Sequence, residues 1–484
     1  MAEEMSWAWA KKRDTPYVKD PVFASNFLHD YRKELPREFR DVRLEEIDFS
    51  EFARFQEKEK LRNSDPVVKK KNASIRKDQR ERLKNKYGYA WVDGKRYEIQ
   101  NWMVEPPGLF IGRGNHPLRG RWKPRVQPRD VTLNLSKDES PPPEYPWKAV
   151  HDHESTWLAR WEEVLTGAMK YVWLHDSSDI RQKRDQLKYE NAIRLGHRID
   201  RVSRYISRGM HAREVKKRKL ATVSYLIERL AMRVGDEKEE DEADTVGAST
   251  LRVEHVKLGE DRLEFDFLGK DSVRWQKTLE VDSDKIVLEN FLRFMNGKRP
   301  NDQIFDGISS EAVNRFLSGA MPGLTAKVFR THQATSTVRN YLKNHSQFPP
   351  PANESEKLYR ARRANLEAAI KCNHKRTPPK NWEESLVKKM GRLKAIEAQD
   401  PKTEKQAARR QERLSKLKFD VQLARETRYY NLNTSLRNYI DPRVYKSWSE
   451  HVGFDWTTIY SKSLQRKFQW ANRARVQWEK IVAQ

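Results

Sequence analysis

The stretch TSLRNYIDPRVYKSW, residues 434–448, places a tyrosine just before a predicted helix. Asp441 and Pro442 are typical of an N-cap followed by proline at the first helical position. The residues that follow give one apolar helical face and a glycine stop: Val444, Trp448, Val452 and Gly453. Tyr439 lies two residues before the cap, where a side chain can be held firmly without being buried. Although most of the 17 tyrosines must simply pack, Tyr439 is a candidate nucleophile.

Four other side chains have the chemistry to assist such a nucleophile. Arg233 follows a predicted amphipathic helix and should project from its last turn, with Gly235 as the expected C′ residue. The buried stripe of that helix is predicted to be Leu220, Val223, Leu226, Ile227 and Leu230. Lys270 is expected at the tip of a strand-turn-strand, Arg330 within a helix, and His374 before a double proline that ends a helix. Each also has an ordinary structural explanation, such as a helix-dipole partner or a solvated lysine.

Together these five residues supply the roles needed to cleave a phosphodiester without a metal. Cations must stabilise the developing negative charge, an acid must protonate the leaving alcohol, and a nucleophile must attack phosphorus. Arginine grips phosphate in a bidentate way and does not lose its charge. A phenol has a pKa of about 10, so it needs nearby cations to react at neutral pH.

The composition favours a polyanionic partner. Lysine and arginine total 96 against 70 acidic residues, a net charge of +26 at pH 7, and nucleic acid is the commonest partner for such an excess. The 15 tryptophans and 18 phenylalanines indicate folded cores rather than a charged tail. Cys372, the one cysteine, excludes a disulfide framework, and no stretch has the length and apolarity of a signal peptide or a membrane span. We therefore expect a soluble intracellular protein.

The glycine-rich, histidine and acidic motifs predict no cofactor. GLFIGRGNHPLRG lacks both the P-loop Lys-Ser/Thr and the dinucleotide spacing. His151 and His153 form an H-x-H pair without further ligands at metal spacing. The acidic run Asp236–Asp244 does not match a calcium loop. We infer no nucleotide and no obligatory metal.

The elements that must position these residues change in type along the chain. Residues 1 to about 90 are charge-dense and helical in pattern, and short strands and turns follow from 89 to 135. Helices are predicted between about 178 and 233, an antiparallel meander at 251–258, 262–269 and 273–281, and helices again from about 308 to 380. Residues 384–427 predict an antiparallel helical hairpin turning at Asp400-Pro401, whose simplest role is that of a structural spacer.

Several motifs, in one order, resemble the eukaryotic-type IB DNA topoisomerases: EPPGLFIGRGNHP, GDEKEEDEADTVG, LRVEH, EFDFLGKDS, LTAKVFRT, CNHKRTPPK, NYIDPR and YSKSLQRKFQWA. The resemblance runs from about residue 20 to the end. It implies a mainly helical α+β protein that forms a two-lobed clamp around duplex DNA. The implied parts are an N-terminal extension (1–19), a cap (20–177), a catalytic core with a small antiparallel sheet (178–383), a coiled-coil linker (384–427) and a helical C-terminal domain (428–484).

The resemblance also assigns roles to residues. It makes Tyr439 the nucleophile that forms a 3′-phosphotyrosyl bond, Lys270 the acid that protonates the 5′-oxygen, and the phosphate clamp Arg233, Arg330 and His374. It implies further DNA contacts at Arg113, Lys170, Tyr171, Arg181, Thr245, Asp271 and Asn438. Three of these match the residues that hold camptothecin-type poisons in eukaryotic members: Arg113, Asp271 and Asn438. The implied function is relaxation of positive and negative supercoils by a monomer that uses neither ATP nor metal.

Two departures from the family pattern and two rival functions stay open. Leu118 stands where eukaryotic members usually have a lysine at the lips of the clamp, and Arg119 is a possible substitute. The family's long charged N-terminal extension is missing, which suits an archaeal member, so we expect a DNA-associated protein of the nucleoid, or of the nucleus if eukaryotic. A tyrosine recombinase uses the same chemistry but usually has histidine where Lys327 lies, three residues before Arg330. A non-catalytic DNA clamp is the rival from another class.

Overall fold

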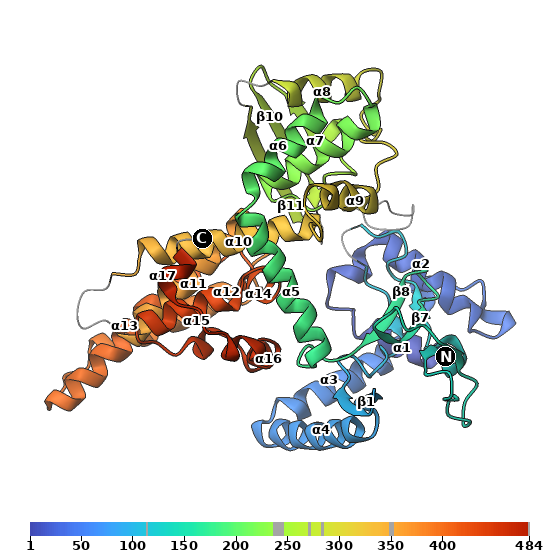
Figure 1. Ribbon diagram of the computed structural model, residues 1–484. Helices are drawn as coiled ribbons and strands as arrows, with labels where there is room; N and C mark the ends of the chain where they lie inside the picture. The colour runs from blue at the N-terminus through green and yellow to red at the C-terminus, as the bar shows by residue number, and fades with distance from the viewer. Residues whose placement is uncertain (113–114, 236–245, 270–272, 282–284, 348–352, 483–484) are drawn as a thin grey trace. The chain divides into compact units, whose positions relative to one another are not determined.

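The computed structural model of the protein describes residues 1–482 except 113–114, 236–245, 270–272, 282–284 and 348–352 (Figure 1). The described residues fall into two compact units, 1–181 and 182–482. Both units are mainly helical with small, mostly antiparallel sheets, which confirms the predicted α+β class. Within the described residues, no helix combines the length and apolarity needed to cross a membrane.

The first unit begins with helices that pack through aromatic side chains. They are α1 (Ala2–Ala10), α2 (Pro21–Lys33), α3 (Ser50–Ser64) and α4 (Pro66–Tyr87). Asp20 caps α2 by accepting hydrogen bonds from the backbone N–H groups of Val22 and Phe23. The core of these helices contains Met5, Trp9, Phe23, Phe27 and Tyr31. Residues from the expected N-terminal extension are therefore part of the same core as α2.

Short strands follow, as predicted for residues 89–135, and they continue to residue 173, beyond the predicted range. β1 (Tyr89–Val92) pairs with β2 (Lys95–Glu98), and β3 (Gly108–Leu109) pairs with β4 (Trp122–Lys123). A four-stranded sheet has the order β6-β5-β7-β8 and consists of β5 (Thr132–Asn134), β6 (Lys148–Val150), β7 (Trp157–Glu162) and β8 (Met169–Trp173). Its strands are antiparallel except for the parallel pair of β5 and β6.

The second unit opens with α5 (Asp179–Gly196), which begins in the first unit, followed by α6 (Ile199–Met210) and α7 (Val215–Leu230). The predicted stripe of α7 is buried, apart from the partly buried Leu220. The predicted end of this helix is wrong. Ala231, not Gly235, adopts the left-handed conformation after it, with φ of 54°, and Arg233 lies beyond the helix instead of in its last turn. Gly235 also has a positive φ, 88°, but four residues later.

The predicted meander is present, with the strand order β11-β10-β9. Its strands are β9 (Val256–Leu258), β10 (Arg262–Gly269) and β11 (Val273–Glu280). The first strand is shorter than predicted because residues 253–255 form a 3-10 turn. The backbone N–H groups of Val253 and Glu254 donate to the carbonyls of Asp302 and Pro300, so they are not available to β10.

Further α-helices follow the meander in the chain (Figure 1). They are α8 (Ile286–Met295), α9 (Ser310–Ala320), α10 (Ala326–Asn344) and α11 (Glu354–Lys371). A continuous hydrophobic core joins α6, α7, α8 and α9 to the sheet, and α10 packs along α11. The predicted end of α11 is wrong, because the helix stops at Lys371, well before the double proline, and His374 lies outside it.

The predicted helical hairpin is confirmed by α12 (Trp382–Glu397) and α13 (Glu404–Glu426), which flank Asp400-Pro401. Ile396, Leu414 and Val421 are its buried apolar residues. The chain then forms α14 (Leu432–Asn438), α15 (Pro442–His451), α16 (Lys462–Lys467) and α17 (Trp478–Val482). Asp441 caps α15 with Pro442 in the first turn, as predicted, and Gly453 after it has a φ of 63°. These helices share a second core with α10 and α11.

Candidate functional site

Tyr439 lies between two helices that hold its backbone from both sides. It follows α14, and its N–H donates to the carbonyl of Ser435 at 2.9 Å. The hydroxyl of Thr335, on α10, donates to the Tyr439 carbonyl at 3.1 Å and accepts from the N–H of Asp441 at 3.1 Å. The side chain is 9% exposed, so the phenol sits in a largely desolvated place. The tyrosine is therefore held firmly, as predicted, but it is buried, which the sequence did not predict.

Arg330 and His374 lie against the ring of Tyr439. The His374 ring stacks on it, with centroids 5.4 Å apart and an interplanar angle of 25°. The guanidinium carbon of Arg330 lies 4.9 Å from the centre of the tyrosine ring. Nη2 of Arg330 is 3.2 Å from Nε2 of His374. Three of the five predicted catalytic residues, from α10 and from the segments after α11 and α14, therefore meet at one point.

His374 is positioned by a short backbone connection to the segment before α14. Its carbonyl accepts from the N–H of Asn431 at 2.8 Å, and Lys375 forms an isolated antiparallel bridge with Tyr430. On the other side, its own N–H donates to the carbonyl of Ala369 at 2.8 Å, at the end of α11. The histidine and the tyrosine are thus carried by segments that are hydrogen-bonded to each other.

Arg233 lies on the turn after α7 and shares a small cavity of about 40 Å³ with Arg330. Gly269, at the end of β10, lines the same cavity. The carbonyl of Arg233 accepts from the N–H of Ala248 at 2.8 Å, which ties its segment to residues 247–249. The approach is so close that a Cβ on Gly247 would lie 2.3 Å from the backbone nitrogen of Gly235. Glycine is therefore required at position 247, where the backbone passes close to the segment that follows Arg233.

The electrostatics of the site favour an ionised phenol. Burial by itself would raise the pKa of Tyr439, but the positive charges of Arg330 and Arg233 outweigh it and lower the pKa below its usual value. Burial lowers the pKa of His374 to about 3, and the same two arginines contribute. The imidazole is therefore neutral at pH 7. With Nε2 accepting from Arg330, the proton would be on Nδ1, which is buried and has no partner among the described residues.

Four predicted residues lie outside the described part of the chain: Arg113, Thr245, Lys270 and Asp271. The acidic run is outside it as well. For Lys270 the strands on either side are described. β10 ends at Gly269 and β11 begins at Val273, so the predicted hairpin is confirmed although its tip is not described.

Family models cover nearly the whole chain. The DNA binding fragment of eukaryotic DNA topoisomerase I matches residues 1–174, its catalytic core matches 177–407, and the C-terminal topoisomerase domain matches 411–480. DNA topoisomerase I, mitochondrial, of Rattus norvegicus is 38% identical over 513 residues, which is 97% of this chain and 85% of the rat protein.

The chain belongs to the eukaryotic DNA topoisomerase I family.

Longer relatives agree with this. DNA topoisomerase 1 of Homo sapiens is 37% identical over 97% of this chain, and that of Drosophila melanogaster is 38% identical over 97%. The chain spans 66% of the human protein and 50% of the Drosophila protein.

The other DNA contacts expected for a topoisomerase I are placed in the separate units. In the first unit, Lys170 and Tyr171 lie on β8, and the Tyr171 ring centroid is 5.3 Å from that of Trp173. Arg181 pairs with Asp176 at 3.0 Å. In the second unit, Asn438 directly precedes Tyr439, and its side chain donates to the Thr434 carbonyl at 3.1 Å.

Arg119, the possible substitute for the lip lysine, binds Asp20 within the first unit. Its Nε and Nη2 lie 2.5 Å and 3.0 Å from the two carboxylate oxygens. Leu118, next to it, is partly buried.

Several residues that hold Tyr439 in place were missed by sequence reasoning. Besides Thr335, the ammonium of Lys188 on α5 donates to the Asn438 carbonyl at 3.1 Å and pairs with Asp185 at 2.7 Å. Arg443 is buried between Asp441, at 2.7 Å, and a second carboxylate on α5. No local pattern marks such residues, because their partners are distant in sequence. The DPR motif is the exception, because Asp441 and Arg443 are two residues apart and could be expected to pair.

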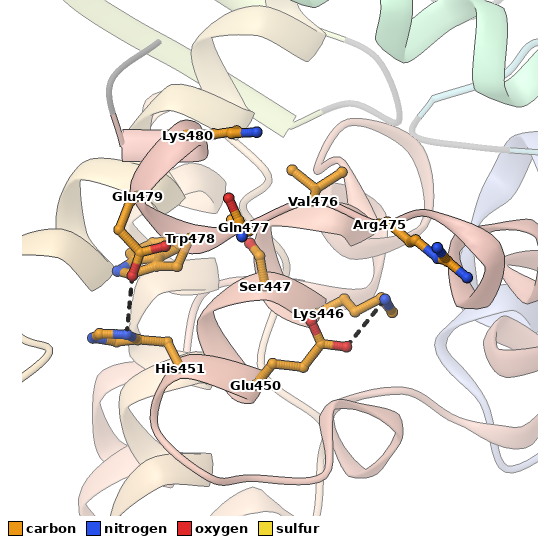
Figure 2. Close-up of a pocket in the computed structure, with 10 residues that line it drawn as sticks. All are labelled: Lys446, Ser447, Glu450, His451, Arg475, Val476, Gln477, Trp478, Glu479 and Lys480. Atoms are coloured by element: carbon orange, nitrogen blue, oxygen red, sulfur yellow. Dashed lines mark ion pairs between the residues drawn. The ribbon is translucent and has the colours of Figure 1, made fainter.

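A larger cavity, of about 600 Å³, lies between α15 and residues 475–480 (Figure 2). Cations and carboxylates alternate around it. His451 pairs with Glu479 at 3.7 Å and Lys446 with Glu450 at 3.0 Å. None of the described candidate catalytic residues lines it, whereas Arg233 and Arg330 line the smaller cavity.

Proposed function

We propose that the protein is a type IB DNA topoisomerase that relaxes supercoiled DNA through a transient single-strand break. The observation that carries this proposal is the cluster of Arg330 and His374 against the ring of Tyr439, with Arg233 lining the same cavity as Arg330. Membership of the topoisomerase I family supports the same reaction.

In this reaction the phenolic oxygen of Tyr439 attacks the phosphorus of one DNA strand. The phenol loses its proton to water, a bond forms between phosphorus and the tyrosine oxygen, and the bond from phosphorus to the 5′-oxygen breaks. Arg233 and Arg330 stabilise the additional negative charge in the transition state. To donate a hydrogen bond to a phosphate oxygen, the neutral His374 must carry its proton on Nε2 instead of the buried Nδ1, so Nε2 must leave Arg330 when DNA binds. Lys270 gives its proton to the departing 5′-oxygen.

Religation is the same reaction in reverse. The 3′-phosphotyrosyl ester retains the energy of the broken bond, so rotation of the free strand can be followed by attack of the 5′-hydroxyl without a nucleotide. The site thus needs only groups that bind phosphate and move protons. This agrees with the sequence, which predicts neither a nucleotide site nor an obligatory metal.

The substrate is duplex DNA, and the net charge of +26 supports it. Each phosphate contact releases counterions. A plot of the logarithm of the affinity against the logarithm of the salt concentration should therefore have a slope of about −0.9 per phosphate contact. We expect the chain to act as a monomer located with DNA in the cell. An affinity that does not change between low and physiological salt would contradict this substrate.

The experiment that tests the function traps the covalent intermediate. Supercoiled plasmid is incubated with the protein in excess EDTA without ATP, and denaturant is added quickly. We expect relaxed plasmid and a protein joined to the 3′ end of a nick. Tyr439→Phe, which lacks only the hydroxyl, should bind DNA within a few-fold of wild type and form no adduct. Relaxation by Tyr439→Phe would assign the nucleophile to another residue, and binding without any adduct by the wild type would favour a non-catalytic clamp.

A further inference from the structure

The ends of α7 and α11 are joined by two cations that bind consecutive carbonyl groups. The ammonium of Lys277, on β11, donates to the carbonyls of Leu230 at 3.1 Å and Lys371 at 2.8 Å. The guanidinium of Arg330 donates to the next carbonyl of each segment, those of Ala231 and Cys372. Each cation thus bridges the same two helix ends, one residue apart.

These carbonyls are the groups that most need such a partner. The last carbonyls of a helix have no intrahelical donor and carry the negative end of the helix dipole. Two helix ends brought together therefore repel each other unless donors or cations lie between them. Lys277 and Arg330 supply both donors and positive charge at this place.

The joined helix ends lead directly to two of the proposed catalytic residues. After each of the two helices, the backbone turns at a residue with positive φ, which is 54° at Ala231 after α7 and 53° at Asn373 after α11. Arg233 comes two residues after the first turn, and His374 comes directly after the second. The separation of the two helix ends therefore sets the separation of the arginine and the histidine.

Lys277 stands at a position where the strand pattern calls for an apolar residue. It shares the inward face of β11 with the buried Trp275 and Leu279, and it is paired in register with the buried Phe265 of β10. Burial lowers the pKa of its ammonium to about 8. A charged side chain kept at an apolar position, where it reduces stability, is typical of a functional site.

We propose that Lys277 is a positioning residue for strand cleavage, which fixes the ends of α7 and α11 to each other and so holds Arg233 and His374 at the separation that the phosphate requires. The inference rests on the proposed topoisomerase function. Lys277 donates to the two carbonyls and does not line the cavity shared by Arg233 and Arg330. It acts through the backbone of the residues that do.

The test compares Lys277→Met with Lys277→Arg and wild type. Methionine keeps a similar length and fits the apolar face but removes the donors, so single-turnover cleavage should slow by about ten- to a hundredfold, as for a small misplacement of catalytic groups. Duplex affinity should stay within about threefold, and the unfolding temperature should change little, because the loss of the hydrogen bonds to the two carbonyls is offset by the removal of a buried charge. Lys277→Arg should restore most of the rate. Lys257→Met, on the exposed side of β9, is the matched loss of one positive charge and should cleave like wild type.

The dependence on pH gives a readout that a purely structural lysine would not change. The charged or ionisable groups around Lys277 are the cations Lys371, Arg330 and Lys375 and the thiol of Cys372. Lys277 should lose its charge near pH 8, whereas an arginine there stays charged. The ratio of the cleavage rate of Lys277→Arg to that of wild type should therefore increase between pH 7 and pH 9. Taking the ratio cancels the titration of groups that both proteins share.

The results separate this inference from the proposed function. A wild type that forms no adduct refutes the function itself. A wild type that forms the adduct, together with a Lys277→Met that cleaves at the same rate, refutes only the positioning role. A Lys277→Met that loses cleavage, affinity and unfolding temperature together also refutes it, because the lysine would then merely stabilise the fold.

Discussion

Thr335 offers a direct test of how the nucleophile is held. Its hydroxyl connects α10, the helix of Arg330, to the two backbone groups that flank Ile440, the Tyr439 carbonyl and the Asp441 N–H, with two hydrogen bonds of 3.1 Å. Thr335→Val replaces the hydroxyl by a methyl group of similar size and helix propensity. The substitution leaves the Tyr439 carbonyl and the Asp441 N–H without this partner.

The size of the effect follows from the two hydrogen bonds. Each contributes about 0.5–1.5 kcal/mol, so the loss is about 1–3 kcal/mol. If this alignment is fully needed in the transition state, each 1.4 kcal/mol slows the reaction about tenfold, which predicts a rate about ten- to a hundredfold lower. DNA affinity should hardly change, because neither hydrogen bond is made to the proposed substrate.

The assay is single-turnover cleavage of a duplex whose cut strand cannot religate, with affinity measured separately. Thr331→Val is the matched control. Its hydroxyl, one turn earlier on α10, bonds to the Lys327 carbonyl of its own helix and to no other described residue. Thr335→Ser keeps the hydroxyl and should retain most of the rate. Cleavage by Thr335→Val within twofold of wild type, or an equal defect in Thr331→Val, would refute the proposed coupling.

Three further predictions concern histidine, the cap of α15 and drug binding. The folded-state pKa of His374 is lowered to about 3 from 6.5, so the unfolded chain takes up the proton first and stability falls as pH decreases between these values, with a slope of up to about 1.4 kcal/mol per pH unit. His374→Gln should lose this part of the slope in urea unfolding at several pH values. Asp441→Ala removes one of the two carboxylates that pair with the buried Arg443 and should reduce the free energy of unfolding by about 3–5 kcal/mol, whereas Asp455→Ala, at an exposed N-cap, should cost about 1 kcal/mol; equal costs would contradict the importance of the buried pair. Camptothecin should increase the covalent adduct of the wild type, and Asn438→Ser should lose most of that increase while still relaxing plasmid; an adduct fraction that saturating drug leaves unchanged would show that the drug site is absent.

Local rules predicted most of the elements, and their failures have identifiable causes. The Asp-Pro cap of α15, the meander and the hairpin of α12 and α13 were predicted correctly because propensity, periodicity and turn chemistry agree there. The end of α7 was not. Glycine is the usual left-handed residue after a helix, so Gly235 was expected, yet Ala231 takes this conformation. Its carbonyl is held by Arg330 and the preceding one by Lys277, and these distant partners stabilise a backbone turn that alanine disfavours by itself.

The sequence by itself determined the chemistry and the family. The residue types at 233, 270, 330, 374 and 439 define a set that can cleave a phosphodiester, and the order of the motifs identifies topoisomerase I. Only the tertiary structure decided which atoms meet. Arg330 and His374 approach the ring of Tyr439 because α10, α11 and the segment around α14 pack in one core. The supporting contacts of Thr335 and Lys277 come from the same packing. Such contacts join side chains to backbone carbonyls far away in the chain, and since every residue has a carbonyl, no sequence pattern can mark the one that will be bound.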